Sequence, residues 1–542
     1  MNTHKDIAVG NGLALSKLLI LVCALLVSFS AFAADPVIRK SAYEDGDNKI
    51  QLKVVKAGRR ALVTVSGVET GQVLGTFRAN NRGKLEEEIS LSSGQVVPCN
   101  IQAETSGGSA TRLLEDAPED CGGQGGGDGE TTPGHDDLVY AGPGTCLECH
   151  DDHALDVFES THYQWKGEAP DMINQVSWIQ GKHAGAVNTY CGNITGNWGG
   201  CSSCHVGRGA EPEEFPSQAQ LENIDCMVCH QDAYKRKKVD GVFQPDIANM
   251  SISMDEAVQT VHEPTRAGCL QCHAKAGGGD AVKRGDLALA TAHTADWQYD
   301  VHMATSGANM NCQSCHVPEN HRFPGKGSDI RPSDLVGMDL DCTSGGCHSS
   351  SPHDSSEING HTEKVACQSC HIPIYAKNAS DSVATEATEM HRSWLSGSIH
   401  DDAPRHPVTE KANNQVPVYR YWNRASDNYL LFDEVYEDGE TGTYHTSMPD
   451  GDVNDPNSKL YPFKYKTSDY PMRTASNQLI ALDTSVFFAT ADADAAAIAG
   501  LKNMGFSGED EYHWVITDTY QLLNHQVSPH GDALSCSSCH LN

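Results

Sequence analysis

Cysteine and histidine residues recur in this chain at a spacing that can hold a metal-containing cofactor. Seven stretches read Cys-x-x-Cys-His, and an eighth, at 342–348, has four residues between its cysteines. Two thiols at this spacing can form thioethers to the vinyl groups of a haem, and the adjacent histidine can bind the iron. Zinc ribbons need no histidine beside each cysteine pair, and a disulfide scaffold has no use for the repeated unit. The pattern predicts eight covalently bound haems c.

Each predicted haem is attached by two cysteines and has the following histidine as its iron ligand. In chain order the attachment residues are Cys146, Cys149 and His150; Cys201, Cys204 and His205; Cys226, Cys229 and His230; Cys269, Cys272 and His273; Cys312, Cys315 and His316; Cys342, Cys347 and His348; Cys367, Cys370 and His371; and Cys536, Cys539 and His540.

The remaining histidines could supply the second axial ligand of each iron. A haem with two strong protein ligands transfers electrons, whereas an open or weakly held position can bind substrate. Candidates that lie shortly after a motif or near a helix end are His153, His162, His302, His321, His353, His361 and His525. Each of them could instead be an ordinary surface histidine or one that hydrogen-bonds a haem propionate.

The elements that position these ligands are short. After residue 139, apolar periodicity predicts helices at SISMDEAVQTV, where Ser253 and Glu256 form a capping box, at ADADAAAIAGLKNM, which stops at Gly505, and at EDEYHWVITDTYQLLNH. We therefore expect residues 139–542 to form a multihaem cytochrome c domain, mainly short α-helices and loops wrapped around eight covalent haems. The cofactors would supply much of its core.

The N-terminal part has a different pattern. Lys5 and Lys17 precede a short apolar run that ends in Ala-Phe-Ala, which predicts a cleaved signal peptide over 1–33 and a periplasmic or extracellular protein. Residues 35–121 contain short alternating runs that predict a small β-sandwich-like domain, either a docking module or a structural appendage. Its Cys99 and Cys121 are a predicted disulfide, and 122–138 is a glycine-rich linker.

The net charge of −33 excludes nucleic acid and anionic membrane surfaces as partners. The basic run at 235–238 is interpreted as a solvated loop. Cys23 would be lost with the signal peptide, so one cysteine, Cys191, is left without a motif or a disulfide partner, and the simplest alternative for it is a buried inert thiol. The stretch KAGGGDAVKRGDL at 275–287 lacks the Gly-Lys-Ser/Thr ending of a phosphate loop.

The order of motifs from Tyr140 onward resembles the octahaem tetrathionate reductase family of multihaem c-type cytochromes. The similar pieces are NTYCGNITGNWGGCSSCHVG, NIDCMVCHQDAYKRKK, CLQCHAKAGGGDAVKRGDL, DVHM, CHVPENH, SSSPH, INGHTEKVACQSCHIP, YPFKY and LLNHQVSPHGDALSCSSCH. The resemblance implies that the second haem is catalytic, with Lys283 as its distal iron ligand and with Cys191 and Asp280 beside it. An amine binds iron only when it is deprotonated. An exposed loop lysine is the plain alternative for Lys283, and Lys235, Lys237 and Lys238 are competing ligands.

These features lead to two functional hypotheses. The first is an exported octahaem reductase of tetrathionate, or of nitrite or hydroxylamine, with a small inorganic sulfur or nitrogen oxyanion as substrate. Its electrons would come from a redox partner cytochrome or a quinol-oxidising membrane protein, and its pocket should be locally basic, with Lys182 and Arg208 as residues to check. The alternative is a non-catalytic conduit, either a periplasmic shuttle or part of an extracellular cytochrome polymer.

Overall fold

The computed structural model describes residues 36–540, except 45–47, 69–71, 92–96, 119–131, 133, 174–177, 328, 339, 383–387 and 399–405. The chain divides into two compact units, Met1–Gly126 and Gly127–Asn542. The predicted signal peptide, Cys121 and most of the predicted linker lie outside the described residues. None of the helices in the described ranges has both the length and the apolar character needed to cross a bilayer.

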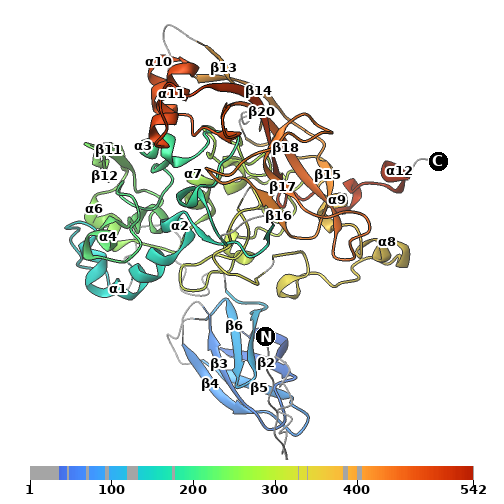
Figure 1. Ribbon diagram of the computed structural model, residues 1–542. Coiled ribbons are helices and arrows are strands. Elements are labelled where there is room, and N and C mark those ends of the chain that lie inside the picture. The colour runs from blue at the N-terminus through green and yellow to red at the C-terminus, as the bar shows by residue number, and fades with distance from the viewer. Residues whose placement is uncertain are drawn as a thin grey trace, which may run out of the picture. The chain divides into compact units, whose positions relative to one another are not determined.

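The first unit is built from two antiparallel sheets, drawn in blue in Figure 1. In β2 the side chains of Ile50, Leu52 and Val54 point inward and alternate with more exposed neighbours, as expected for strands that bury one face. The all-β character predicted for this region is confirmed, and Cys99 is disulfide-bonded. One sheet has the order β1 (Val37–Glu44), β2 (Lys49–Val55), β5 (Leu85–Ser90), and the other β4 (Val73–Arg78), β3 (Leu62–Gly67), β6 (Asn100–Thr105), β7 (Gly108–Leu113).

In the second unit, each Cys-x-x-Cys-His motif lies on or beside a short helical turn. A helical turn places residues three apart on one face, so both thiols of a motif point the same way. Where the sequence offers a cap, the turn starts there: the Thr265 hydroxyl accepts the N–H of Gly268 at the start of α7. The turns are α1 (Gly144–Glu159), α3 (Trp198–Cys201), α5 (Met227–His230), α7 (Arg266–His273), η7 (Cys312–Ser314), η8 (Ser344–Gly346), α9 (Cys367–His371) and α12 (Cys536–Cys539).

Further helices connect these turns, and two of the three helix predictions are confirmed. Helix α6 begins after Ser253, whose hydroxyl accepts the N–H of Glu256, and α11 ends just before Gly505, which has a φ of +82°. The connecting elements are α2 (Thr161–Gln164), η3 (Lys182–Ala184), η4 (Ile194–Gly196), α4 (Gln218–Asn223), η5 (Ile247–Asn249), α6 (Met254–Gln259), η6 (Leu289–Ala292), α8 (Ser356–His361), α10 (Thr484–Thr490), α11 (Ala493–Asn503) and η9 (His530–Asp532).

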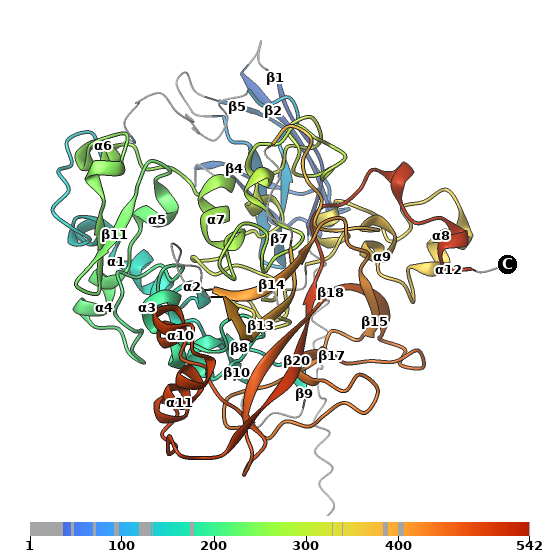
Figure 2. The same ribbon diagram turned by 90° about the horizontal axis from the view of Figure 1, so that it is seen from above.

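A nine-stranded sheet runs through the second unit, so the expectation of mainly short helices and loops is not confirmed. In Figures 1 and 2, α1, α4 and α6 lie on one side of this sheet, and α8, α9 and α12 lie on the other. Its order is β14 (His406–Ala412), β13 (Thr388–Ser398), β18 (Lys459–Arg473), β20 (Tyr512–Leu522), β17 (Tyr444–Pro449), β16 (Ser426–Asn428), β9 (Met172–Ile173), and β15 (Val418–Trp422) and β19 (Gln478–Leu479) also pair with β18. Two small hairpins pair β8 (Gly167–Glu168) with β10 (Ile179–Gln180) and β11 (Arg236–Val239) with β12 (Val242–Pro245).

The helix predicted at EDEYHWVITDTYQLLNH is wrong, because most of this segment is strand β20. Its residues pair with β18 without interruption, from Tyr512 opposite Arg473 to Leu522 opposite Phe463. The segment is rich in β-branched and aromatic residues, which favour a pleated surface. Its apolar residues also fit a helical spacing, so it is the pairing with β18 in the folded protein that makes this segment a strand and not a helix.

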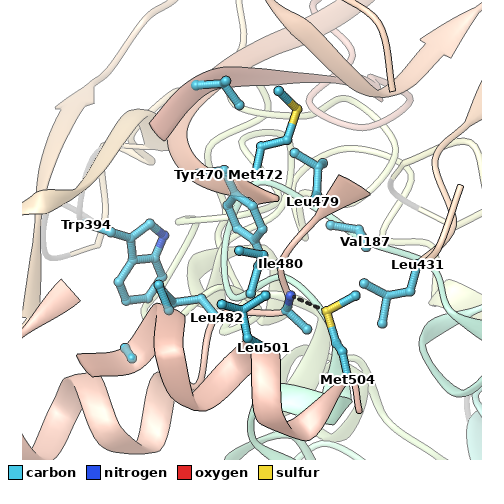
Figure 3. Close-up of a cluster of buried hydrophobic side chains, with 14 of the residues drawn as sticks. Val187, Trp394, Leu431, Tyr470, Met472, Leu479, Ile480, Leu482, Leu501 and Met504 are labelled. Carbon is cyan, nitrogen blue, oxygen red and sulfur yellow. Dashed lines mark hydrogen bonds between the residues drawn. The ribbon is translucent and has the colours of Figure 1, made fainter. Parts of the chain in front are cut away.

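The main hydrophobic core of the second unit lies between this sheet and the helix pair α10–α11. Trp394 from β13, Tyr470 from β18 and Leu501 from α11 are almost fully buried there, and the backbone N–H of Ala481 points to the sulfur of Met504 (Figure 3). Val187 belongs to the same cluster. The core therefore anchors the segment that leads to Cys191.

Candidate functional site

The thiols of different motifs lie next to one another. Four pairs are within hydrogen-bonding reach: Cys146 with Cys226, Cys204 with Cys272, Cys269 with Cys312, and Cys342 with Cys367. Three further neighbours interact through their charges: Cys229 with Cys269, Cys315 with Cys347, and Cys370 with Cys539. The attachment points of all eight motifs thus form one contiguous series, which branches at the fourth motif.

Seven of the eight motif histidines face a second histidine ring. Two imidazoles that share one iron have their centres roughly 6 Å apart, because each metal–nitrogen bond is about 2 Å long. The ring centres of the facing pairs are 5.9–6.4 Å apart: His150–His135, His230–His321, His273–His162, His316–His525, His348–His302, His371–His353 and His540–His361. These pairs have the spacing of six-coordinate sites with two histidine ligands.

His205 of the second motif has different surroundings. It is fully buried, and the rings around it are those of Tyr163, Trp165 and Trp198, with centres 4.9, 5.6 and 5.4 Å away. Burial lowers its pKa to about 4, so the ring is neutral. Within the described ranges no second imidazole faces it. The second motif therefore differs from the other seven in its axial partner.

Lys283 lies in the turn that follows the fourth motif. Its ammonium donates a hydrogen bond to Asp329 Oδ2 at 3.0 Å, and the Asp329 side chain is only 2% exposed. Gly277, at φ +88°, is needed in this turn because a Cβ there would lie 3.0 Å from Lys283 Cβ and 3.2 Å from the Tyr190 ring. The glycine-rich stretch thus brings the backbone of Lys283 against Tyr190.

Lys182 connects Lys283 to the second motif. Burial, with a smaller contribution from the nearby charge of Lys283, lowers the pKa of Lys182 to about 7, while the Cys201 thiol opposes the shift. Cys201 in turn lies close enough to Cys191 for their charges to interact. The structure therefore gathers a lysine from the segment after the fourth motif, a thiol and the first cysteine of the second motif in one region.

The sulfur of Cys191 is held by Arg392, whose Nη1 lies 3.5 Å from it. The same guanidinium makes a bidentate pair with Glu389, with N–O distances of 2.8 and 2.7 Å. It also donates to the backbone carbonyls of Tyr190 and Gly277 at 3.0 and 2.9 Å. Arg392 thus joins the Cys191 segment to the glycine-rich turn.

The acid beside Lys283 is Asp329. Burial opposes ionisation, but the charges of Lys283 and Arg331 outweigh it and hold the pKa of Asp329 below its usual range. Asp280 lies in the same turn as Lys283, and its carboxylate accepts the N–H of Leu289 at 2.8 Å. No motif or spacing marks Asp329 in the sequence, and only the fold reveals its position.

A family model described as bacterial cytochrome c matches residues 408–542 of the chain. The solved structure of an octaheme cytochrome c from Shewanella oneidensis has a TM-score of 0.62 and 28% sequence identity, over 75% of this chain and 93% of that chain. The chain belongs to the octahaem cytochromes c. A relative from Archaeoglobus fulgidus, described as an uncharacterized protein, is 31% identical over 34% of this octahaem cytochrome and 75% of the relative.

The donor set of this octahaem cytochrome fits haem c. Each motif offers two thiols and a histidine, and the facing imidazoles have the spacing that iron requires. Among the described cysteines, Cys99 is in a disulfide and the others are free thiols. Haem c binding fits this family, and the cysteines and histidines of these motifs would hold the cofactor.

Six of the seven histidines proposed as second ligands face a motif histidine. His153 is the exception: its ring centre lies 5.5 Å from that of His150 and 5.3 Å from that of His321. His135, which sequence reasoning missed, faces His150 with an angle of 9° between the ring planes. It precedes its motif, whereas the predicted ligands were histidines shortly after a motif or near a helix end.

Of the other basic residues, Lys238 lies against the second motif, since it also donates to the Ser202 hydroxyl, whereas Lys235 and Lys237 contact residues outside that motif. Arg208 donates to the carbonyl of Phe243, Lys235 to that of Asp232, and Lys238 to that of Gly199, while Lys237 pairs with Asp246. Arg236, from the basic run interpreted as a solvated loop, is largely buried: it pairs with Asp225 and donates to carbonyls of the second motif, Ser203 and His205. Arg236, the first residue of strand β11, therefore holds the second motif in place through these two carbonyls.

Proposed function

We propose that this chain is an exported octahaem c-type cytochrome that reduces a small sulfur or nitrogen oxyanion at its second haem. Tetrathionate is the first candidate, and nitrite or hydroxylamine come next. The observation that supports it is the second motif, where His205 lacks an imidazole partner within the described ranges and Lys283 and Cys191 lie nearby. A sixth ligand other than histidine suits a site that must release it for substrate.

The eight motifs would hold eight haems, and the seven facing histidines would complete seven of them. When bound, the haems supply electrons one at a time along the contiguous series of attachment points. The amine of Lys283 is the candidate sixth ligand of the second iron. Asp329 Oδ2 can hold that side chain as an ammonium when the position is needed for substrate.

The charges around the site suit an anionic substrate. Among the described residues, Lys182, Lys283, Arg331 and Arg392 lie near two carboxylates, Asp329 and Glu389, in a chain whose net charge is −33. Charges act strongly in a buried site, because solvent screens them little. The Nη1 of Arg331 is buried without a hydrogen-bond partner among the described residues, while its Nε faces Asp329 Oδ2 at 3.7 Å, so Nη1 could donate to an oxyanion.

Cys191 is placed to contact the sulfur atoms of such a substrate. Reduction of tetrathionate takes up two electrons, breaks the central S–S bond and releases two thiosulfate ions, without net proton uptake. Arg392 fixes the Cys191 sulfur at 3.5 Å and supplies a positive charge beside it. The thiol and the guanidinium can therefore orient a sulfur oxyanion while the bond breaks.

Reoxidation of the reduced protein tests the proposal. The wild type, Lys283→Ala and the control Lys275→Ala are reduced and mixed with tetrathionate, nitrite or hydroxylamine, and the haem absorbance is followed. Lys275 is the control because it is exposed in the same segment and donates to Gln271. We expect Lys283→Ala to slow reoxidation by at least one compound and Lys275→Ala to leave the rate unchanged. The proposal fails if no compound oxidises the wild type faster than it oxidises Lys283→Ala.

A second candidate is an electron conduit, and the contiguous motifs favour it. Cys149 of the first motif and Cys536 and Cys539 of the eighth are exposed, so electrons could enter and leave at the surface. A redox partner cytochrome or a quinol-oxidising membrane protein would be the donor. A wild type that exchanges electrons with a soluble cytochrome but with none of the three compounds would support the conduit.

A further inference from the structure

Two lysines of strand β18, Lys464 and Lys466, are completely buried and have no part in the reduction proposed above. They are two residues apart on one strand, so both side chains emerge on the same face of the sheet. A buried ammonium is costly unless hydrogen bonds and counter-charges replace its water. What these two lysines contact therefore shows why the fold retains them.

Lys464 holds the backbone of Lys283. Its Nζ lies 2.9 and 3.0 Å from the carbonyl oxygens of Val282 and Lys283. It also donates to the Tyr190 hydroxyl at 3.0 Å and to the Thr388 hydroxyl at 2.7 Å. The Tyr190 hydroxyl itself points to the Lys283 carbonyl at 3.3 Å. The turn that carries Lys283 is thus fixed to the sheet through one ammonium.

Lys466 holds the Cys191 segment in the same way. It donates to the carbonyl of Thr189, lies 4.3 Å from the centre of the Tyr190 ring and pairs with Glu389 at 3.3 Å. Glu389 is also the bidentate partner of Arg392, which contacts the Cys191 sulfur. Backbone carbonyls and the face of an aromatic ring accept N–H groups from these lysines. The geometry of each contact therefore restricts where the contacted segment can lie.

We propose that Lys464 and Lys466 are positioning residues, a pair that fixes Lys283 and Cys191 relative to the second motif. Lys464 sets where the amine of Lys283 can reach, and Lys466 sets the position of the thiol through Glu389 and Arg392. The inference rests on the proposed function for the role of Lys283 and Cys191. It does not depend on which oxyanion is reduced.

The test compares Lys464→Met and Lys466→Met with Lys377→Met in the haem-loaded full chain. Lys377 is a matched control, because it is also buried and donates to a backbone carbonyl, that of Gln298, away from the second motif. Two readouts are independent of activity. The first is the electron paramagnetic resonance signal of the second haem in the oxidised protein. The second is the rate at which iodoacetamide alkylates Cys191.

We expect Lys464→Met to convert the signal of the second haem toward high spin and to leave the other haems unchanged. Lys466→Met should speed alkylation of Cys191 about tenfold, as expected when one buried hydrogen-bonded contact is lost. Lys464→Arg should restore part of the wild-type signal, because a guanidinium retains charge and donors. Lys377→Met should resemble the wild type in both readouts.

The proposal is overturned if folded Lys464→Met and Lys466→Met give the wild-type signal and labelling rate. If these variants do not fold, Tyr190→Phe decides, because it removes the hydroxyl that accepts from Lys464 and points to the Lys283 carbonyl and to Gln521. A wild-type signal and labelling rate in Tyr190→Phe would then overturn the proposal. Both readouts remain valid for a wild type that reduces none of the three compounds, so failure of the proposed function is distinguished from failure of this inference.

Discussion

Replacing Glu389 by glutamine should destabilise the second unit measurably. The side chains of Glu389, Arg392 and Lys466 are 1%, 6% and 0% exposed, and one carboxylate neutralises both cations. Glutamine keeps the shape but removes the charge, so two buried cations lose their partner. Breaking a buried pair in this way costs about 3–5 kcal/mol.

The shift in melting temperature follows from the size of the unit. With about 2.1 cal/mol/K of unfolding entropy per residue, a unit of roughly 400 residues has an unfolding entropy of about 0.85 kcal/mol/K. A loss of 3–5 kcal/mol then lowers the melting temperature by about 4–6 °C. Scanning calorimetry of the haem-loaded wild type and Glu389→Gln at neutral pH measures the difference directly.

The pH dependence of the difference gives a second check. Burial opposes ionisation of Glu389, but Arg392 and Lys466 outweigh it, so its pKa is lowered. The stability that this carboxylate contributes is therefore present above the ordinary glutamate pKa and is lost as the pH falls through the lowered value. The gap between wild type and variant should narrow over that range. A Glu389→Gln protein that melts within about 1 °C of the wild type at neutral pH would refute the reasoning.

Three further predictions concern other parts of the molecule. Burial opposes protonation of His445, but the hydrogen bonds that its ring donates to Asp518 and Asp438 raise its pKa, so its stabilising effect is complete below pH ~6.5 and is lost as the pH rises through the raised value; Asp518→Asn should weaken this dependence in melts from pH 5 to 9. Leu501→Ala should cost about 2–5 kcal/mol in calorimetry, because Leu501 is fully buried in the core of Figure 3. His353→Ala should turn one haem, that of His371, high-spin in paramagnetic resonance, and an unchanged spectrum would exclude His353 as a ligand.

The chemistry that is local in sequence could be predicted from the sequence alone. A Cys-x-x-Cys-His motif carries both attachment points and one ligand within five residues, so haem binding needs no knowledge of the fold. The same holds for the strands of the first unit and for α6, where the Ser253 cap accepts the N–H of Glu256, three residues away. Short-range alternation and capping are properties of the chain itself.

Features that require contact between segments far apart in the sequence were determined only by the tertiary structure. Strand β20 carries apolar residues that fit a helix, and pairing with β18 makes it a strand. Lys283 meets Asp329 from 46 residues away and Lys464 from 181, and no local pattern marks either partner. A buried charge is stable only where the fold supplies counter-charges and carbonyls around it. The site around the second motif could therefore be located only from the folded structure, in which β18, the glycine-rich turn and the Cys191 segment lie together.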